Sequence, residues 1–393
     1  MNFAKLRRDL FANPVDGAIS LALLLAIAAG LKAILGWAMA RADWAVIQAN
    51  STLLAVGRYP IAQQWRLWLL TSLLTAAAGV SWGLLRGRHW PRNDRITAAL
   101  MTAAALALPA WVQLNPTLQA RWWLMALLLL LGRWAAGRWG QRIPGGLRQL
   151  LPLTWPALYV IGLGLISGGL GLSPVRTSQW GGLLLTLIEA SFAILLCFPL
   201  GIALALGRRS TLPLLRWGST LYIEFVRGAP LITLLFLGQN ILGFLLPGGV
   251  APDRVWRAAW VLTFFAAAYV AEAVRAGLAA LPRGQVEAAR CLGLNPLQTL
   301  VHVVLPQALR VALPATVGQF ISLLQDTTLL SLIGLLDLLG TARAIMANPD
   351  FLGRNAEVYL VLAVLFWCCC AALGLGSRAL EQRLNRHHSS GLR

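Results

Sequence analysis

Long apolar runs separated by short polar stretches dominate the hydrophobic pattern of this chain. A helix needs about 20 mostly apolar residues to cross the hydrocarbon core of a bilayer, so runs of this length predict transmembrane helices. Ten runs qualify, and they cover residues 17–40, 66–85, 96–113, 120–136, 152–171, 181–207, 219–246, 258–280, 307–336 and 357–379. We therefore expect an all-α, polytopic membrane protein with about ten transmembrane helices.

Two of these runs need comment. The fourth is short, and Arg133 lies in its final turn. The first could be a cleaved signal peptide, because a basic N-terminus precedes it and Ala38-Met39-Ala40 resembles a cleavage site. It is longer than a typical signal-peptide core and contains Lys32, so a span is the favoured interpretation.

The distribution of basic residues predicts the orientation, because short cytoplasmic loops carry the excess of Lys and Arg. With ten spans and both termini in the cytoplasm, 22 of the 33 Lys and Arg fall on the cytoplasmic side and 9 on the other. Omitting the fourth span would place the basic N-terminus outside. The count therefore supports ten spans, with the N- and C-termini in the cytoplasm.

Composition and charge narrow the function classes. The 393 residues are 58% hydrophobic and only 12% charged, yet the net charge is +19. Nucleic-acid-binding domains do not carry apolar runs of this length. The positive charge therefore indicates which loops are cytoplasmic, and not binding to nucleic acid. Five cysteines and four scattered histidines form no metal-ligand pattern, and neither lysine lies in a phosphate-binding loop. Any ATP that is used must be hydrolysed by another polypeptide.

The loop between the eighth and ninth runs, residues 284–306, differs from the other loops. An Ala-rich stretch that ends at Gly293 predicts a short helix with a glycine C-cap. Asn295 and Pro296 then predict the N-cap and first residue of a second short helix, which Pro306 is expected to close. By periodicity alone, an amphipathic connector at the membrane surface is an equally good interpretation.

The same loop resembles the EAA signature of ABC importer permeases. The matching residues are Gly284, Glu287, Ala288, Ala289, Gly293, Leu305 and Pro306, with Val303 where the family has Ile. In that family the loop is a coupling helix that docks in a groove of the ATPase subunit. Small alanines would permit close packing, Gly293 the turn, and Glu287 hydrogen bonds to the partner.

The resemblance extends over 181–385, which is similar to polar amino acid permeases of the histidine-transporter type. The similar segments are 182–187, 222–231, 268–277 and 326–335. The first five spans, including Gly57-Arg58-Tyr59-Pro60, resemble the larger permeases of general L-amino acid and glutamate/glutamine/aspartate transporters. We divide the chain into an N-terminal extension (1–176), a five-helix permease core (177–385) and a cytoplasmic tail (386–393). Gln325 stands where the family often has Lys, which leaves the charge preference for substrate open.

This resemblance implies the function and the partners. The chain would be the permease subunit of an importer of polar L-amino acids in the bacterial inner membrane, working by alternating access and not itself an enzyme. It would pair with a second, homologous permease, two ATPase subunits and a periplasmic binding protein, and contact no nucleic acid. The chain would bind no cofactor or metal, and ATP and Mg would lie on the partner ATPases.

Charged residues within or beside spans are costly in lipid and are therefore candidates for function. Glu224 and Arg227, like Glu272 and Arg275, are three residues apart and could pair on one helix face, as a gate or as a structural clasp. Asp326 lies deeper in the ninth span and has no cation nearby on its helix. It could bind a substrate ammonium, pair with another helix, or cap a broken segment. With it we group four polar neighbours as candidates for the substrate path: Gln325, Thr327, Thr328 and Ser331.

Two other function classes compete with the importer. An ion-driven secondary transporter would show similar halves with matching broken helices, whereas the two halves of this chain differ sharply. Thirteen of the 17 tryptophans precede residue 181 and ten of the 14 carboxylates follow it. A membrane-embedded enzyme should carry a cluster of His or carboxylates at one membrane face, and the sequence shows none.

Overall fold

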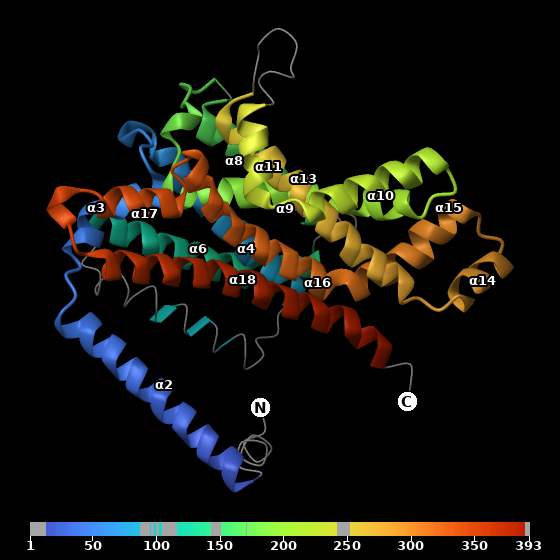
Figure 1. Cartoon of the computed structure of the whole chain (residues 1–393), viewed down its shortest axis with the longest axis horizontal. Helices are drawn as coiled ribbons and strands as arrows, with labels where there is room; N and C mark the ends of the chain where they lie inside the picture. The colour runs from blue at the N-terminus through green and yellow to red at the C-terminus, as the bar shows by residue number, and fades with distance from the viewer. Residues whose placement is uncertain are drawn as a thin grey trace.

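The computed structural model describes residues 13–86, 95, 98–99, 102–103, 116–142, 151–169, 171–241 and 252–389. These residues form helices and connecting loops, with no β-strand in the described ranges and one isolated β-bridge between Gly182 and Asp337. The predicted all-α fold is confirmed (Figure 1). The predicted span 96–113 lies almost wholly outside the described residues.

The extension and the core contribute separate sets of helices. Those of the extension are α2 (Pro14–Ala40), α3 (Ala45–Val56), η1 (Ile61–Gln63), α4 (Trp65–Arg86), α6 (Pro116–Trp139), η2 (Gly140–Arg142) and α8 (Leu151–Ser167). After η3 (Thr177–Gln179), the core begins with α9 (Gly182–Arg208), α10 (Pro213–Gly228), α11 (Leu231–Asn240), α13 (Arg254–Ala279), α14 (Gly284–Cys291) and α15 (Pro296–Gln298). It ends with the π-helix η5 (Thr299–Val304), α16 (Leu305–Asp326), η6 (Thr327–Ile333), α17 (Leu338–Met346), η7 (Pro349–Phe351) and α18 (Asn355–Ser389).

Six helical segments of the described chain are long and apolar enough to cross a membrane. They are Pro14–Ala40, Ile61–Leu84, Gly182–Arg208, Arg254–Ala279, Pro296–Ile333 and Asn355–Arg378. The bent pair α10 and α11 makes a seventh if it counts as one span. Helices also occupy the predicted spans 120–136 and 152–171, as α6 and the short apolar α8.

Two predicted spans are interrupted. The span predicted at 219–246 breaks between α10 and α11, where the chain turns by 106°. Pro230 causes this break, because it has no N–H to donate and forces Ala229 into an extended conformation (φ −92°, ψ 137°). The span predicted at 307–336 stops being α-helical at Asp326 and tightens into the 3₁₀ helix η6, which Gly334 ends in a left-handed conformation.

The EAA loop has the predicted caps and one wrong boundary. Gly293 follows α14 with φ 77°, and the Asn295 side chain accepts a hydrogen bond from the backbone N–H of Gln298. Pro306 does not close the second helix. It lies near the start of α16, which continues directly from α15 and η5. Proline cannot donate the i→i−4 hydrogen bond of an α-helix, and the π-helical turn of η5 lies immediately before it.

The centre of the core is the packing of α9 against α13. After Glu189, every fourth residue of α9 is small and buried: Ala193, Cys197, Gly201 and Ala205. At Gly201 a Cβ atom would lie 2.6 Å from the Cγ1 of Val270, so the two helices approach as closely as glycine permits. We call the interface between α9 and α13 the α9–α13 seam. Helix α16 packs on α13, and α18 on α16 (Figure 1).

The extension is attached mainly at the end of the core opposite to α14. Helix α3, for which no element was predicted, packs against α9, α17 and α18 and forms an apolar cluster with Leu338 and Val358. The turn after α3 lies against the start of α9, where a Cβ on Gly57 would be 2.4 Å from the Cα of Gly181. An ion pair of 2.9 Å between Asp43 and Arg354 adds to this attachment.

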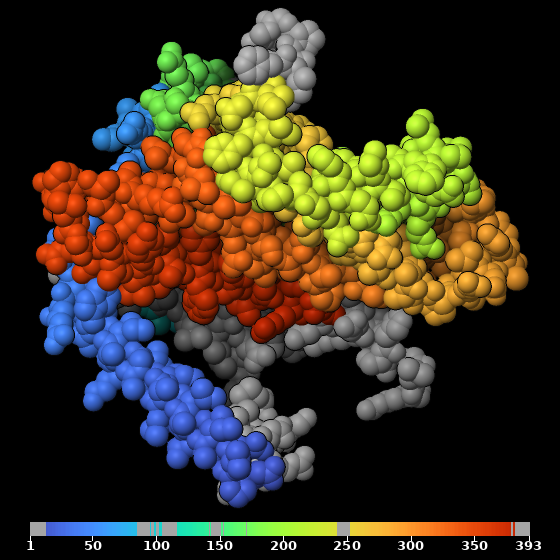
Figure 2. Space-filling model, in the orientation of Figure 1, coloured from blue at the N-terminus to red at the C-terminus, as the bar shows by residue number. Residues whose placement is uncertain are grey.

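Helix α2 is the exception to this compact packing. It has no buried residue and lies apart from the body of the molecule (Figures 1 and 2). Apolar side chains lie around its whole circumference, and Asp16 and Lys32 are its charged residues; this pattern is expected for a helix that is surrounded by lipid.

Candidate functional site

A cluster of five charged residues joins three core helices at the end of the bundle that leads to α14. Arg208, at the end of α9, donates to Glu272 of α13 (Nη1–Oε1, 2.7 Å) and to Glu224 of α10 (Nη2–Oε1, 2.9 Å). Glu272 also contacts Arg275 at 2.9 Å and Arg227 at 3.7 Å. We call this group the charge cluster. It links the ends of α9, α10 and α13 through side chains alone.

One of the two predicted pairs forms in the cluster, and the members of the other pair have different partners. Glu272 and Arg275 meet on one face of α13, as their spacing predicts. Glu224 pairs with Arg208, while Arg227 turns to Glu272 and lies over the Tyr269 ring, 5.6 Å from its centroid. Arg208 stands out in the sequence only by its place in the last turn of a helix, where a cation is stabilised by the helix dipole.

The two carboxylates of the cluster differ in their surroundings. The Glu272 side chain is 18% exposed and contacts three guanidinium groups, whereas that of Glu224 is 57% exposed and contacts one. A charge that is partly withdrawn from water depends on its partners much more than an exposed one does. Glu272 is therefore the centre of the cluster.

The substrate-path candidates do not converge on a binding site in this conformation. The hydroxyls of Thr327, Thr328 and Ser331 each donate to a backbone carbonyl three residues earlier, so they are satisfied within their own turns. Gln325 is exposed, and its side chain lies 3.9 Å from the sulfur of Cys370 on α18.

Asp326 lies where the α-helix gives way to η6. It is partly buried and does not cap η6 through its side chain. In the described part of the chain, no ion pair or hydrogen bond engages its carboxylate. The capping role at this end of the core belongs instead to Asp337, which is buried and accepts from the N–H groups of Leu339 and Gly340 at the start of α17.

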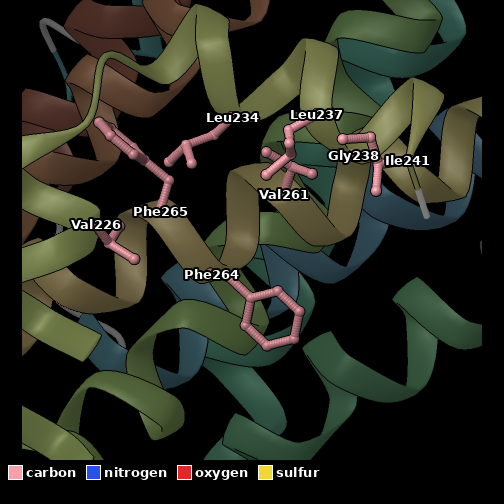
Figure 3. A pocket seen from close by; sticks show the side chains of 8 residues that line it. All are labelled: Val226, Leu234, Leu237, Gly238, Ile241, Val261, Phe264 and Phe265. Atoms are coloured by element: carbon pink, nitrogen blue, oxygen red, sulfur yellow. The ribbon is translucent and has the colours of Figure 1, made fainter. Parts of the chain in front are cut away.

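A cavity lies at the break between α10 and α11 (Figure 3). It has a volume of about 200 Å³, and its wall consists of Val226, Leu234, Leu237, Gly238, Ile241, Val261, Phe264 and Phe265. None of these side chains carries a polar group. The cavity therefore lacks the charged or hydrogen-bonding groups that the ammonium and carboxylate of an amino acid require.

The EAA loop, with α14 and α15, projects from the end of the core to which α13 leads (Figure 1). Gly284, Glu287 and Ala288 are exposed on α14, as are Gly293 and Pro306 further along. Ala289 is buried against the chain itself, so of the two alanines only Ala288 is open to a partner. The loop is tied back to the core where Gln307 of α16 donates to the side chain of Gln285 at 3.1 Å.

A buried acid with no predicted role lies in α9. Glu189 is fully buried, and neither of its carboxylate oxygens has a hydrogen-bond partner in the described part of the chain. In the sequence, Glu189 is notable only as an acidic residue within a predicted span. Such residues are rare in spans, and this alone makes it a candidate for function. The described residues contain no group of three His, Cys, Asp or Glu side chains that could hold a metal ion.

Comparison with known proteins identifies the family of this chain. Residues 197–386 match the family model described as the binding-protein-dependent transport system inner membrane component. The inner membrane amino-acid ABC transporter permease protein YhdY of Escherichia coli (strain K12) is 35% identical over 88% of this chain and 79% of its own length. The glutamate/glutamine/aspartate/asparagine transport system permease protein BztC of Rhodobacter capsulatus is also 35% identical, over 88% of this chain and 80% of its own.

One solved structure, the crystal structure of an amino acid ABC transporter with histidines, is 31% identical with a TM-score of 0.46. It covers 51% of this chain and 92% of its own. Both long relatives match the extension as well as the core, so the similarity is not confined to the EAA loop. The chain therefore belongs to the family of binding-protein-dependent transport system inner membrane components, the multi-span permease subunits of ABC transporters.

Proposed function

We propose that this chain is one of two membrane-spanning subunits of an ATP-driven importer of polar L-amino acids, and that it works by alternating access. Both long relatives are amino-acid permeases by name, and one of them is named for glutamate, glutamine, aspartate and asparagine. A heterodimer with a second homologous permease, two ATPases and a periplasmic binding protein completes the assembly. ATP and Mg are bound by the ATPases, and this chain hydrolyses nothing.

The observation that carries this proposal is the mechanical continuity of the EAA loop with the core. From Pro296 to Ile333, α15, η5, α16 and η6 form one helical run of 38 residues. A force applied to α14 and α15 is transmitted along this run, because a hydrogen-bonded helix does not shorten under a small load. An ATPase that moves the exposed face of α14 thus moves α16, which packs on α13 and α18.

In this arrangement the end with α14 faces the cytoplasm, as do both termini, and the end with α3 and α17 faces the periplasm. Residues 1–176 form the extension, 177–385 the permease core, and 386–393 the tail. The charge cluster then lies close to the cytoplasmic surface. Because it joins three helices through paired charges, we assign it the role of a brace that holds this conformation.

The test is uptake of polar amino acids by proteoliposomes that contain the complete transporter with its binding protein. Uptake should require ATP. Glu287→Lys should reduce it at least about tenfold, since reversing a charge at a docking surface costs a kcal/mol or more. Asp350→Lys, a matched reversal at an exposed position after α17, should leave uptake unchanged.

Two results would contradict the proposal. Uptake that follows an ion gradient in the absence of ATP would indicate a secondary transporter. Full uptake by the Glu287→Lys variant would show that α14 does not couple the two subunits.

A further inference from the structure

Glu189 is the one acidic member of a series of buried α9 residues spaced four apart. Leu185 precedes it in this series, and Ala193, Cys197, Gly201 and Ala205 follow it. Ala193 and Cys197 are as fully buried as Glu189 itself. The carboxyl group lies about 10 Å along the helix from Gly182 at 1.5 Å per residue. Three residues further on, the ring of Phe192 contacts that of Trp256, so this part of α9 packs against α13.

Apolar side chains of α13 lie level with Glu189. Gly201 contacts Val270 and Ala267. Counting twelve residues back along both helices, which run in the same direction, brings Glu189 level with Val255 and Ala258. Both are buried and apolar. A metal ion at Glu189 would lack the further oxygen ligands that hard cations need.

The charged and titratable groups around Glu189 do not compensate its charge. Asp253, the N-cap of α13, is the group that acts on it electrostatically, and it is of like charge. Tyr159 of α8 is the nearest phenol, and its hydroxyl donates to the carbonyl of Ile188. Arg254 donates to the carbonyl of Ile333, and Arg257 to that of Gln239, and neither has an ion pair with Glu189 in the described part of the chain.

The other elements that pack on α9 add no partner. Helices α3 and η6 contain no titratable side chain. The charged residues of α10, α16 and α17 either pair with other groups or do not contact Glu189. Together with the N-cap of α17, they are Arg216, Glu224, Arg227, Arg310, Asp326, Asp337 and Arg343.

An isolated carboxylate in such surroundings does not stay ionised. The free energy of stripping water from an unpaired charge is several kcal/mol, and binding a proton is the cheaper alternative. The position lies near the periplasmic end of the seam in the proposed orientation, so that water enters as soon as α9 and α13 separate there. A hydrated carboxyl ionises at neutral pH.

We propose that Glu189 is a proton-binding site that is occupied while the periplasmic end of the α9–α13 seam is closed and empties when that end opens. This rests on the proposed alternating access. The carboxylate takes its proton from periplasmic water on closing and returns it to the same side on opening, so no proton crosses the membrane. Acid on the periplasmic side stabilises the closed seam and slows the cycle.

The experiment measures ATP-driven uptake by the complete transporter as a function of pH on the side of the binding protein. Wild-type uptake should rise about threefold or more between about pH 6 and about pH 8, as ionisation favours the opened seam. Glu189→Gln cannot ionise, so its uptake should be independent of pH and close to the acid value of the wild type. Asp350→Asn, which removes an exposed carboxylate, should follow the wild-type profile.

A second measurement uses the unmodified protein. Infrared spectra of the transporter with isotope-labelled glutamate should show the carbonyl band of a protonated side chain at neutral pH, and trapping the ATP-bound state should remove it. A pH profile of Glu189→Gln that equals the wild-type profile, or the absence of the band, would overturn the proposal. If ATP-dependent uptake is missing in every variant while the band is present, the proposed function has failed and the proton site stands.

Discussion

The two ends of α9 handle charge in opposite ways. At one end Arg208 holds two carboxylates from two other helices, at 2.7 and 2.9 Å. Toward the other end Glu189 is fully buried and has no hydrogen-bond partner in the described residues. Between them runs a seam of small residues. The paired charges hold the ends of three helices in one arrangement. An unpaired buried carboxyl makes the packing around it depend on whether water enters, so the two ends of α9 differ in how they respond to hydration.

Among the variants that test this comparison, the one that removes the centre of the charge cluster should lose the most stability. Glu272→Ala leaves the guanidiniums of Arg208, Arg227 and Arg275 without their shared carboxylate. Since the side chain is mostly buried, we expect a loss of about 2–3 kcal/mol, at the lower end of the cost of breaking a buried pair because some water reaches it. Thermal melting of the purified transporter measures this loss. Melting equal to that of the wild type would show that the cluster braces nothing.

Adding a methyl group between α9 and α13 tests how tightly the α9–α13 seam is packed between the two ends. Gly201→Ala places a methyl group 2.6 Å from Val270, and overpacking of this kind costs about 1–3 kcal/mol. Gly318→Ala on α16 is the matched control, because a Cβ there meets no atom within 4 Å. The first variant should melt at a lower temperature and the second at the wild-type temperature or above. Equal melting of both would mean that α9 and α13 are not as tightly packed as described.

The smallest effect is expected at the exposed edge of the cluster. Glu224→Ala removes one contact of Arg208 from a side chain that is 57% exposed, and such pairs contribute about 0.2–1 kcal/mol. At high salt concentration, the difference in stability between this variant and the wild type should be smaller still, because exposed charges are screened. A loss as large as that of Glu272→Ala would place the centre of the brace at Glu224 and contradict the geometry.

The sequence located the spanning helices of the core well, because hydrophobicity over about 20 residues is a local property. The span predicted at 181–207 is α9, at Gly182–Arg208, and the last predicted span lies within α18. The caps at Gly293 and Asn295 were also predictable, since each depends on a few neighbouring residues. Pro306 was misassigned because proline both ends and begins helices, and only the path of the chain shows which applies here.

The breaks inside predicted spans were harder to predict. Hydropathy stays high across Pro230 and across Asp326, so an apolar window cannot register a 106° turn or a change to a 3₁₀ helix. Helix α3 was missed for the opposite reason, because Gln48, Asn50 and Ser51 interrupt a run of only 12 residues.

The sequence by itself determined the class of this protein, the main spans of the core and the local form of the EAA loop, because these depend on neighbours along the chain. Only the tertiary structure decided that Arg208 is the partner of Glu224 and Glu272, and that Glu189 has no hydrogen-bond partner among the described residues. Those outcomes depend on which helix faces which and at what height. Contacts between residues 16 and 64 positions apart follow from the packing of α9 against α10 and α13, and no local pattern encodes them.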